Sequence, residues 1–243
     1  MTYCVGLLLN EGLVLASDTR TNAGVDQVAV FPKMHRFEVK GERVIVLLTA
    51  GNLAITQSVV TRLQELLDDD HQRHLYNANS MFEVAELVGD QVREVFKRDA
   101  EHLKHHHAEF HASILVAGQI KGERPRLFNI YNAGNFIEAS QETPYFQIGE
   151  TKYGKPIIDR VIQADTSMMD AVKCTLISFD STIKSNISVA APIDLLAYRT
   201  DSLHTECYQR VAENDAYFQA LRKGWSEGLK QVFHQLPDAD WCA

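Results

Sequence analysis

Thr2 is the residue whose position most directly suggests chemistry. It follows the initiator methionine and opens the apolar, β-prone run Tyr3-Cys4-Val5-Gly6-Leu7-Leu8-Leu9. Because methionine is normally removed when the next residue is small, Thr2 is expected to become the N-terminal residue. An N-terminal threonine carries a hydroxyl nucleophile together with an α-amine of pKa about 7.7–8.0 that can act as its base. The start of the chain therefore suggests a nucleophile held in place by a strand.

Two charged residues are spaced so that they can assist Thr2. Residues 2–10 and 13–19 are predicted to form a hairpin, in which the start of the first strand lies beside the end of the second. Asp18 is therefore expected beside Thr2, and Lys33, which enters the strand expected to lie adjacent to the hairpin, is expected to join them. A lysine cation makes a nearby hydroxyl easier to deprotonate, and an aspartate keeps that lysine charged and oriented.

Gly51 completes this set of candidate residues. It follows the expected strand 44–48, where a backbone N–H with no side chain in the way can serve as an oxyanion site. Taken singly, Asp18 is most simply a loop cap and Lys33 a surface lysine, so their significance comes from their joint placement with Thr2. Cys4 is expected to pack inside its strand rather than to act as the nucleophile.

The rest of the chain alternates strand blocks with pairs of helices. Residues 19–32 are predicted to be a polar loop. Further strands are expected at 35–39, 44–48, 111–119, 126–131, 135–139, 145–148, 187–191 and 194–198, and helices at 55–66, 81–95, 155–162, 167–179 and about 203–235. This order suggests an α+β fold with two antiparallel sheets face to face and helices outside each, a four-layer αββα sandwich with a C-terminal helical extension. With no Pro- or Ser-rich linker, residues 1–243 are expected to form one domain.

Composition excludes several classes of function. A formal net charge of −8 argues against a nucleic-acid partner, because phosphate binding requires a basic face. No apolar run approaches the ~18 residues of a membrane span, and no signal peptide is visible. The four cysteines lack CxxC spacing, which favours reduced thiols in a cytoplasmic protein over disulfides or a zinc site. They are Cys4, Cys174, Cys207 and Cys242.

The order and spacing of several segments together resemble a known family. These segments are Thr2, Leu15-Ala16-Ser17-Asp18-Thr19-Arg20, Lys33, Thr49-Ala50-Gly51, Leu115-Val116-Ala117-Gly118-Gln119 and Phe146-Gln147-Ile148-Gly149. The chain is similar to the proteasome β-subunits and to the related bacterial peptidase of the two-ring ATP-dependent protease, and most of all to the bacterial ancestral β subunits, the Anbu group. The resemblance extends to about residue 200, and the helix beyond it looks like the extension of that group.

The resemblance implies an N-terminal nucleophile (Ntn) hydrolase fold and a threonine-type peptidase that needs no metal or organic cofactor. Thr2 would be nucleophile and, through its amine, base. Lys33 would lower the pKa of the hydroxyl, Asp18 would orient Lys33, and Gly51 would supply the oxyanion N–H. The resemblance also implies a homo-oligomer, as a ring or an open helical assembly, that acts on peptides or proteins and has an ATPase or adaptor as a candidate partner.

Two segments depart from the family pattern. Glu150 stands where the relatives carry a serine that supports the terminal amine, and the nearest match to a later Asp-x-x-Ser-Gly turn is 182–186, with Asp180 two residues too early. Two alternatives therefore stay open. One is a proteasome-fold scaffold with little proteolytic activity, and the other is an Ntn amidohydrolase acting on a small amide.

Three other motifs have simpler structural readings. Segment 149–156 nearly matches a phosphate-binding loop, but Pro156 occupies the position that needs Ser or Thr, so a strand-to-helix turn is expected. The histidines at 105–107 and His111 suggest a metal site, but a strand beginning at 111 breaks their common face, which favours a solvated helix end. The acidic run 68–70 is expected to end a helix.

Overall fold

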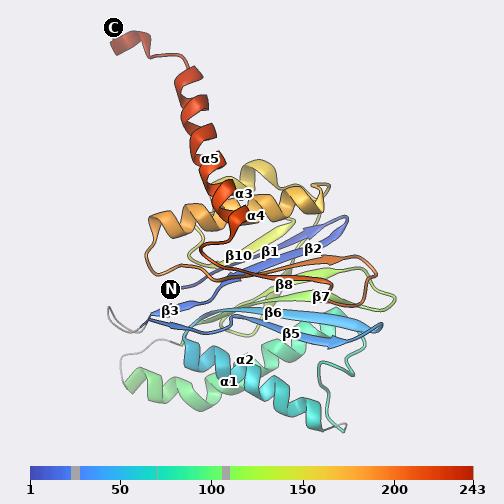
Figure 1. The fold of residues 1–243 in the computed structure, drawn as a ribbon. Helices are drawn as coiled ribbons and strands as arrows, with labels where there is room; N and C mark the ends of the chain where they lie inside the picture. Colours follow the sequence, from blue (N-terminus) through green and yellow to red (C-terminus); the bar gives the residue numbers. More distant parts are fainter. Residues whose placement is uncertain (23–27, 70, 106–109, 243) are drawn as a thin grey trace.

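Two five-stranded antiparallel sheets pack face to face, with a pair of helices covering the outer face of each (Figure 1). The computed structural model describes residues 1–22, 28–69, 71–105 and 110–242. The first sheet has the order β10 (Tyr145–Gly149), β1 (Tyr3–Leu9), β2 (Gly12–Asp18), β11 (Ile193–Arg199) and β12 (Cys207–Val211). The second has the order β5 (Met34–Val39), β6 (Arg43–Gly51), β7 (Ala112–Ile120), β8 (Arg126–Ile130) and β9 (Phe136–Glu138). The expected αββα sandwich is confirmed.

Several of the helices begin at residues whose side chains cap them. The second sheet is covered by α1 (Leu53–Glu65), which continues as the 3-10 turn η1 (Leu66–Asp68), and by α2 (Met81–His105); the first is covered by α3 (Lys155–Val161) and α4 (Met168–Ser185). Asn52 accepts a hydrogen bond from the Ala54 amide, and Ser167 accepts one from the Asp170 amide. Such caps satisfy N–H groups that have no partner within the helix.

The core has three layers, one between the sheets and one beneath each pair of helices. Every residue of β1 and β2 is buried. This burial explains the unbroken apolar runs of the first hairpin, because its strands are covered on both faces. Cys4 lies opposite Ser17 in the register of this hairpin, so the start of β1 and the end of β2 lie side by side.

The predicted long helix from about residue 203 was wrong at its N-terminal end. Residues Cys207–Val211 instead form β12, an edge strand with Val211 opposite Ile193 of β11. Tyr208 and Val211 are three residues apart, a spacing compatible with a helix, but the free edge of β11 provides hydrogen-bond partners for a strand. The helix α5 (Ala216–Gln235) starts later, where Asp215 accepts from the Phe218 amide, and the short 3-10 turn η2 (Asp240–Cys242) follows it.

Two further expectations also differ from the structure. Residues 187–191 form a turn rather than a strand, since the Val189 amide donates to the Asn186 carbonyl directly after α4. Residues 19–32, predicted to be a loop, contain a small ribbon of β3 (Arg20–Asn22) paired with β4 (Val28–Val30). Both segments are held by local contacts, because the ribbon pairs two parts of the same segment and the turn is closed on Asn186.

No helix among the described residues is both long and apolar enough to cross a membrane.

Candidate active site

A buried ion pair lies at the start of the chain. The Nζ atom of Lys33 is 2.8 Å from Oδ1 of Asp18, and both side chains are almost completely shielded from solvent. Asp18 ends β2, as expected from the hairpin. Lys33 precedes β5, which belongs to the second sheet and is not a neighbour of the hairpin within the first. The lysine thus reaches Asp18 from the facing sheet.

This pair contacts the residues on both sides of Thr2. Oδ1 of Asp18 also accepts a hydrogen bond from the Tyr3 amide at 2.9 Å. Nζ of Lys33 donates to the carbonyl of Arg20 at 2.6 Å and to that of Met1 at 3.4 Å. Thr2 itself is only 9% exposed. The three residues expected to come together, Thr2, Asp18 and Lys33, are therefore clustered.

Burial and charge perturb the ionisable groups of this cluster. Burial raises the pKa of Asp18, while the Lys33 cation and the hydrogen bonds from Lys33 and the Tyr3 amide act against that rise. The pKa of the Met1 amine is lowered, first by burial and then by Lys33, while Asp18 and Glu150 act in the opposite sense. Perturbed ionisable groups next to a cavity are typical of functional sites.

A cavity of about 420 Å³ opens beside Thr2. Its walls combine the first residues of the chain, the β3 ribbon, the end of β6 and the start of α1. They are formed by Met1, Thr2, Thr21, Lys33, Thr49, Ala50, Gly51, Asn52, Leu53 and Thr56. The cavity brings Gly51 to the same site as Thr2 and Lys33.

Gly51 occupies a position that excludes other residues. Its φ is +118°, and a Cβ atom there would lie 2.2 Å from the carbonyl oxygen of His111. Only glycine adopts such a conformation without strain. The glycine at the end of β6 is therefore required by the backbone, which leaves this wall of the cavity without a side chain.

Glu150 is a site residue that the sequence analysis treated only as a departure from the family pattern. Its backbone N–H donates to the Thr2 carbonyl at 2.7 Å, and its carboxylate, only 7% exposed, accepts from Nδ2 of Asn186 at 2.8 Å. The preceding Gly149 has a φ of +82°, and a Cβ there would lie 2.0 Å from the Thr2 carbonyl oxygen. A glycine directly before a charged residue was the one sequence signal of this close approach.

Cys4 packs in the core between the sheets, as expected. The residue is fully buried, and its Sγ lies 3.7 Å from the Thr49 carbonyl oxygen. Burial, with a smaller contribution from Asp18, raises the pKa of the Cys4 thiol. Since the thiolate is the nucleophilic form of cysteine, this environment keeps Cys4 unreactive.

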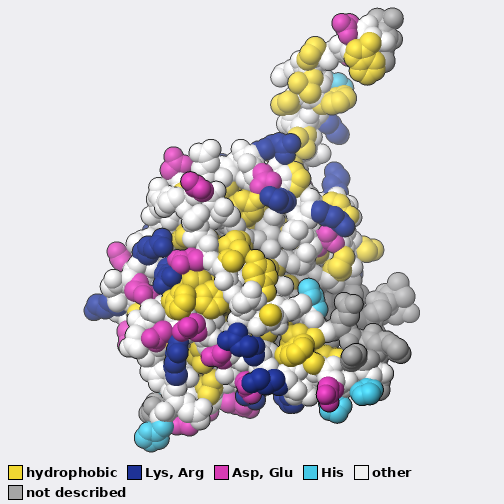
Figure 2. Space-filling model, turned by 180° about the vertical axis from the view of Figure 1, so that it is seen from behind, with side chains coloured by type: hydrophobic (Ala, Val, Ile, Leu, Met, Phe, Trp, Pro, Cys, Tyr) yellow, Lys and Arg dark blue, Asp and Glu magenta, His cyan; other side chains and the backbone are white. Residues whose placement is uncertain are grey.

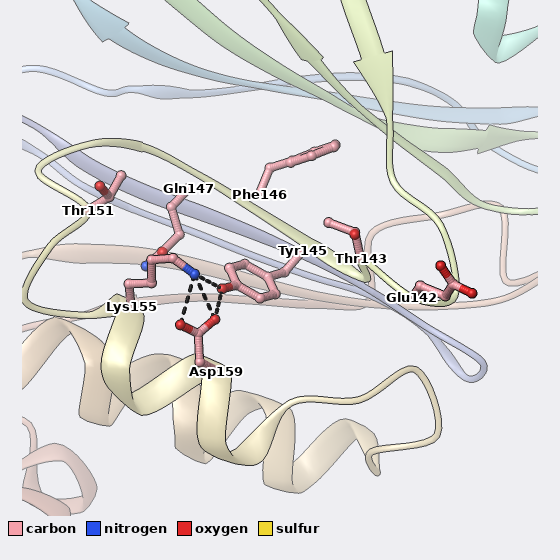
Figure 3. Close-up of a pocket in the computed structure, with 8 residues that line it drawn as sticks. All are labelled: Glu142, Thr143, Tyr145, Phe146, Gln147, Thr151, Lys155 and Asp159. Atoms are coloured by element: carbon pink, nitrogen blue, oxygen red, sulfur yellow. Dashed lines mark hydrogen bonds and ion pairs between the residues drawn. The ribbon is translucent and has the colours of Figure 1, made fainter.

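A second pocket, of about 450 Å³, lies between β10 and the start of α3 (Figure 3). Within it, Nζ of Lys155 lies 2.8 Å from the Tyr145 hydroxyl and from Asp159, and Tyr145 also donates to Asp159. Lys155 is the lysine of the segment that resembles a phosphate-binding loop. Because its charge is already paired with Asp159, the structure favours the expected strand-to-helix turn over a phosphate site.

Part of the histidine cluster and the last residue of the acidic run 68–70 lie outside the residues that the structure describes. His106, His107 and Asp70 lie outside the described residues, while the exposed His111 contacts Asn132 at 3.4 Å. In the part of the chain that the structure describes, no three His, Cys, Asp or Glu side chains are grouped so that they could hold a metal ion.

The sandwich, with a threonine at the head of a central strand and a buried lysine–aspartate pair beside it, defines the class of N-terminal nucleophile folds. Residues 2–195 match the family model described as "Proteasome subunit". A comparison with curated proteins found no match. The chain belongs to the proteasome subunit family, within its Anbu group.

Solved structures of Anbu proteins support this assignment over nearly the whole chain. Anbu from Yersinia bercovieri is 52% identical, with a TM-score of 0.93 and 98% of each chain covered. Anbu from Pseudomonas aeruginosa, described as a helical assembly, is 48% identical, with a TM-score of 0.93 and 98% of each chain covered. Anbu from Hyphomicrobium sp. strain MC1 is 47% identical, with a TM-score of 0.89 and coverage of 98% of this chain and 99% of the other.

Proposed function

We propose that this protein is a threonine-type peptidase that hydrolyses peptide bonds through an acyl-enzyme on Thr2, within a proteasome-like homo-oligomer. The observation that carries the proposal is the buried Lys33–Asp18 pair, which contacts the residues on both sides of Thr2. A buried ion pair is a poor way to stabilise a fold, because desolvation offsets much of the attraction between the charges. Its position beside Thr2, a residue that lines the cavity, is what a threonine nucleophile needs.

The proposed reaction begins after removal of Met1, which frees the amine of Thr2. That amine takes the proton from Oγ1 as the oxygen attacks the carbonyl carbon of the substrate. Lys33 stabilises the negative charge that develops on Oγ1, and the N–H of Gly51 faces the oxyanion. The tetrahedral intermediate then collapses, the ammonium protonates the departing amine, and water later hydrolyses the ester on Thr2.

Removal of Met1 is the condition that the mechanism imposes. With Met1 in place the nitrogen of Thr2 belongs to a peptide bond and cannot act as a base. The decisive measurement is the intact mass of the purified protein before and after incubation with a peptide epoxyketone, which reacts with both the hydroxyl and the amine of an N-terminal threonine. We expect a protein lacking Met1 that gains one adduct, and no adduct on a Thr2→Ala variant.

Labelling separates the two hydrolases from the scaffold, and a survey of peptide and small-amide substrates separates the peptidase from the amidohydrolase. Retention of Met1, or a free Thr2 that never reacts, would contradict the peptidase and favour a scaffold. A reactive Thr2 that turns over small amides but not peptides would favour the amidohydrolase. A cavity of about 420 Å³ lies in the size range of small-ligand sites and is large enough for a substrate side chain, which supports recognition of a peptide residue next to the scissile bond.

The C-terminal helix supports the proposed assembly. Phe218 and the ion pair of Arg222 with Asp180 attach the first turns of α5 to α4, and the remainder stands clear of the body (Figure 1). Figure 2 shows apolar side chains along this projecting segment. Those with at least half of their surface exposed are Leu229, Val232, Phe233, Leu236 and Trp241. We propose that a second copy of the chain covers them, as the helical assembly of the Pseudomonas aeruginosa relative suggests.

The proposal also places the protein in the cytoplasm. Cys4, Cys174 and Cys207 are free thiols. Free thiols are the usual state of cysteine in that compartment, where glutathione and thioredoxin keep thiols reduced.

A further inference from the structure

We propose that the contacts of Met1 and Thr2 with Lys33 and Glu150 protect the Met1–Thr2 peptide bond in the folded protein, so that Met1 is removed only before the chain folds. This inference rests on the proposed function and deepens it, because it assigns the release of the nucleophile to a class of reaction and to a stage. The reaction is hydrolysis by a methionine-specific exopeptidase. Water supplies a hydroxyl to the Met1 carbonyl carbon and a proton to the Thr2 nitrogen as the C–N bond between them breaks.

The Met1–Thr2 bond lies where the chain passes from solvent into the sheet. Met1 is 61% exposed, Thr2 is 9% exposed and Tyr3 is completely buried. All seven residues of β1 are buried as well. An exopeptidase must bring its own catalytic groups within hydrogen-bonding reach of the scissile carbonyl. Exposure of the Met1 side chain alone does not allow this, because the residues that follow the bond are enclosed by the protein.

Both carbonyl groups next to the bond are held by other parts of the chain. The carbonyl of Met1, which the water must attack, accepts a hydrogen bond from Nζ of Lys33 at 3.4 Å. The carbonyl of Thr2 accepts one from the backbone N–H of Glu150 at 2.7 Å. Lys33 precedes β5 of the second sheet, and Glu150 follows β10 of the first. The bond therefore cannot leave the protein unless contacts with both of these segments are broken.

The strand that begins at Tyr3 prevents the first two residues from moving outward. In its sheet, β1 lies between β10 and β2, with Tyr3 opposite Gly149 and Cys4 opposite Ser17. The Tyr3 amide donates to Oδ1 of Asp18 at 2.9 Å. A strand with partners on both edges opens only together with its neighbours, and such openings are rarely populated. An exopeptidase therefore acts on this bond only in an unfolded or transiently opened chain.

A chain that folds with Met1 in place is consequently blocked. Its Thr2 nitrogen belongs to a peptide bond and cannot act as a base. All three donors of the Lys33 ammonium are engaged, one of them by the Met1 carbonyl. In an extended chain, by contrast, the small side chain of Thr2 favours excision. The fraction of active subunits is therefore decided by competition between excision and folding, and it does not change afterwards.

The test uses full-length protein that keeps Met1, purified from cells in which methionine aminopeptidase is inhibited. Purified methionine aminopeptidase is added to the folded protein, to the same protein as it is diluted out of urea, and to a synthetic peptide of residues 1–10. The peptide is also added to the folded sample, to establish that the exopeptidase is active there. Intact mass measures the loss of methionine, a readout that requires no activity of the protein itself.

We expect the folded protein to lose methionine at least about a hundredfold more slowly than the peptide, because cleavage of an enclosed segment follows the population of its open form. The peptide in the folded sample should be cleaved at its usual rate. Of the protein diluted out of urea, a fraction should lose methionine, and this fraction should rise with the concentration of exopeptidase, as competition with folding requires.

Two glycine variants test whether the contact of Thr2 with Glu150 provides the protection. Gly149 has a φ of +82°, and a Cβ there would lie 2.0 Å from the Thr2 carbonyl oxygen. The matched control is Gly122→Ala, at a φ of +90° with no atom within 4 Å of its Cβ. We expect Gly149→Ala to raise the excision rate of the folded protein about tenfold, through strain at this contact, and Gly122→Ala to leave it close to wild type. The circular dichroism spectrum and the Tm establish that each variant is folded.

Excision from the folded wild-type protein at the rate of the peptide would overturn the inference, as would loss of Met1 without any added exopeptidase. Equal acceleration by the two glycine variants would also overturn it, because the protection would then not depend on the contact of Thr2. Epoxyketone labelling of protein lacking Met1 tests the proposed function separately. A protected bond together with an unreactive free Thr2 would keep the inference and contradict the peptidase, whereas excision from the folded protein followed by labelling would do the reverse.

Discussion

Lys33 contacts Asp18 across the interface of the two sheets, with Nζ of the lysine 2.8 Å from Oδ1 of the aspartate. Both side chains are buried, and the lysine makes two further hydrogen bonds to backbone carbonyls. The pair connects the second sheet to the end of β2 at the point where the chain begins. It thus orients a charge toward the N-terminus from the opposite layer of the sandwich.

The first prediction concerns the two residues of this pair. Lys33→Met leaves the Asp18 carboxylate buried without its cation, and we expect it to lower the free energy of unfolding by about 3–5 kcal/mol. The double variant Asp18→Asn/Lys33→Met should recover most of this loss, because it buries no uncompensated charge, yet it should not react with the epoxyketone. Urea denaturation measures the stability, and a double variant no more stable than Lys33→Met would contradict the account.

The second prediction compares two glycines with positive φ. Gly51→Ala combines backbone strain with a Cβ placed 2.2 Å from the His111 carbonyl oxygen, whereas Gly122→Ala has a φ of +90° but no atom within 4 Å of its Cβ. We expect Gly122→Ala to cost about 1 kcal/mol and Gly51→Ala to cost clearly more than that, with loss of epoxyketone labelling. Equal losses of stability would show that the contact with His111 relaxes freely.

The third prediction concerns the relative rates at which buried and exposed thiols are labelled at pH 8. Burial raises the pKa of the Cys4 thiol and raises that of Cys174 to about 12, so both remain protonated at pH 8, whereas Cys207 is exposed. Because only the thiolate reacts, iodoacetamide should modify Cys207 far faster than either buried thiol in native protein. Denaturation should remove the difference. Rapid native labelling of Cys4, measured by peptide mass spectrometry, would contradict its placement in the core.

The fourth prediction concerns the projecting part of α5. The double variant Leu229→Ser/Phe233→Ser removes two exposed apolar side chains one helical turn apart, and we expect the oligomer to dissociate in sedimentation velocity experiments. The matched control, Glu227→Ser/Gln231→Ser, makes the same replacement at the same spacing on the opposite side of the helix and should leave the assembly intact. Dissociation of both variants alike would point to loss of the helix rather than of an interface.

Local patterns in the sequence were sufficient to predict the first hairpin and, with it, the position of Asp18 beside the start of the chain. Strands 2–10 and 13–19 are separated by a short turn, so the proximity of Asp18 to the start of the chain follows from a contact between near neighbours in sequence. The helical stripes of α1 and α2 and the cap of α4 at Ser167 are also local features, and the structure confirms them.

What the sequence could not decide depends on pairings between distant segments. Lys33 reaches Asp18 from the facing sheet, and Glu150 reaches Thr2 because β10 pairs with β1 across more than half of the chain. Residues 207–211 form a strand because β11 offers a free edge, which no local periodicity reveals. Such contacts arise only when the whole sandwich is assembled, since it is the packing of the layers that brings these backbones and charges together.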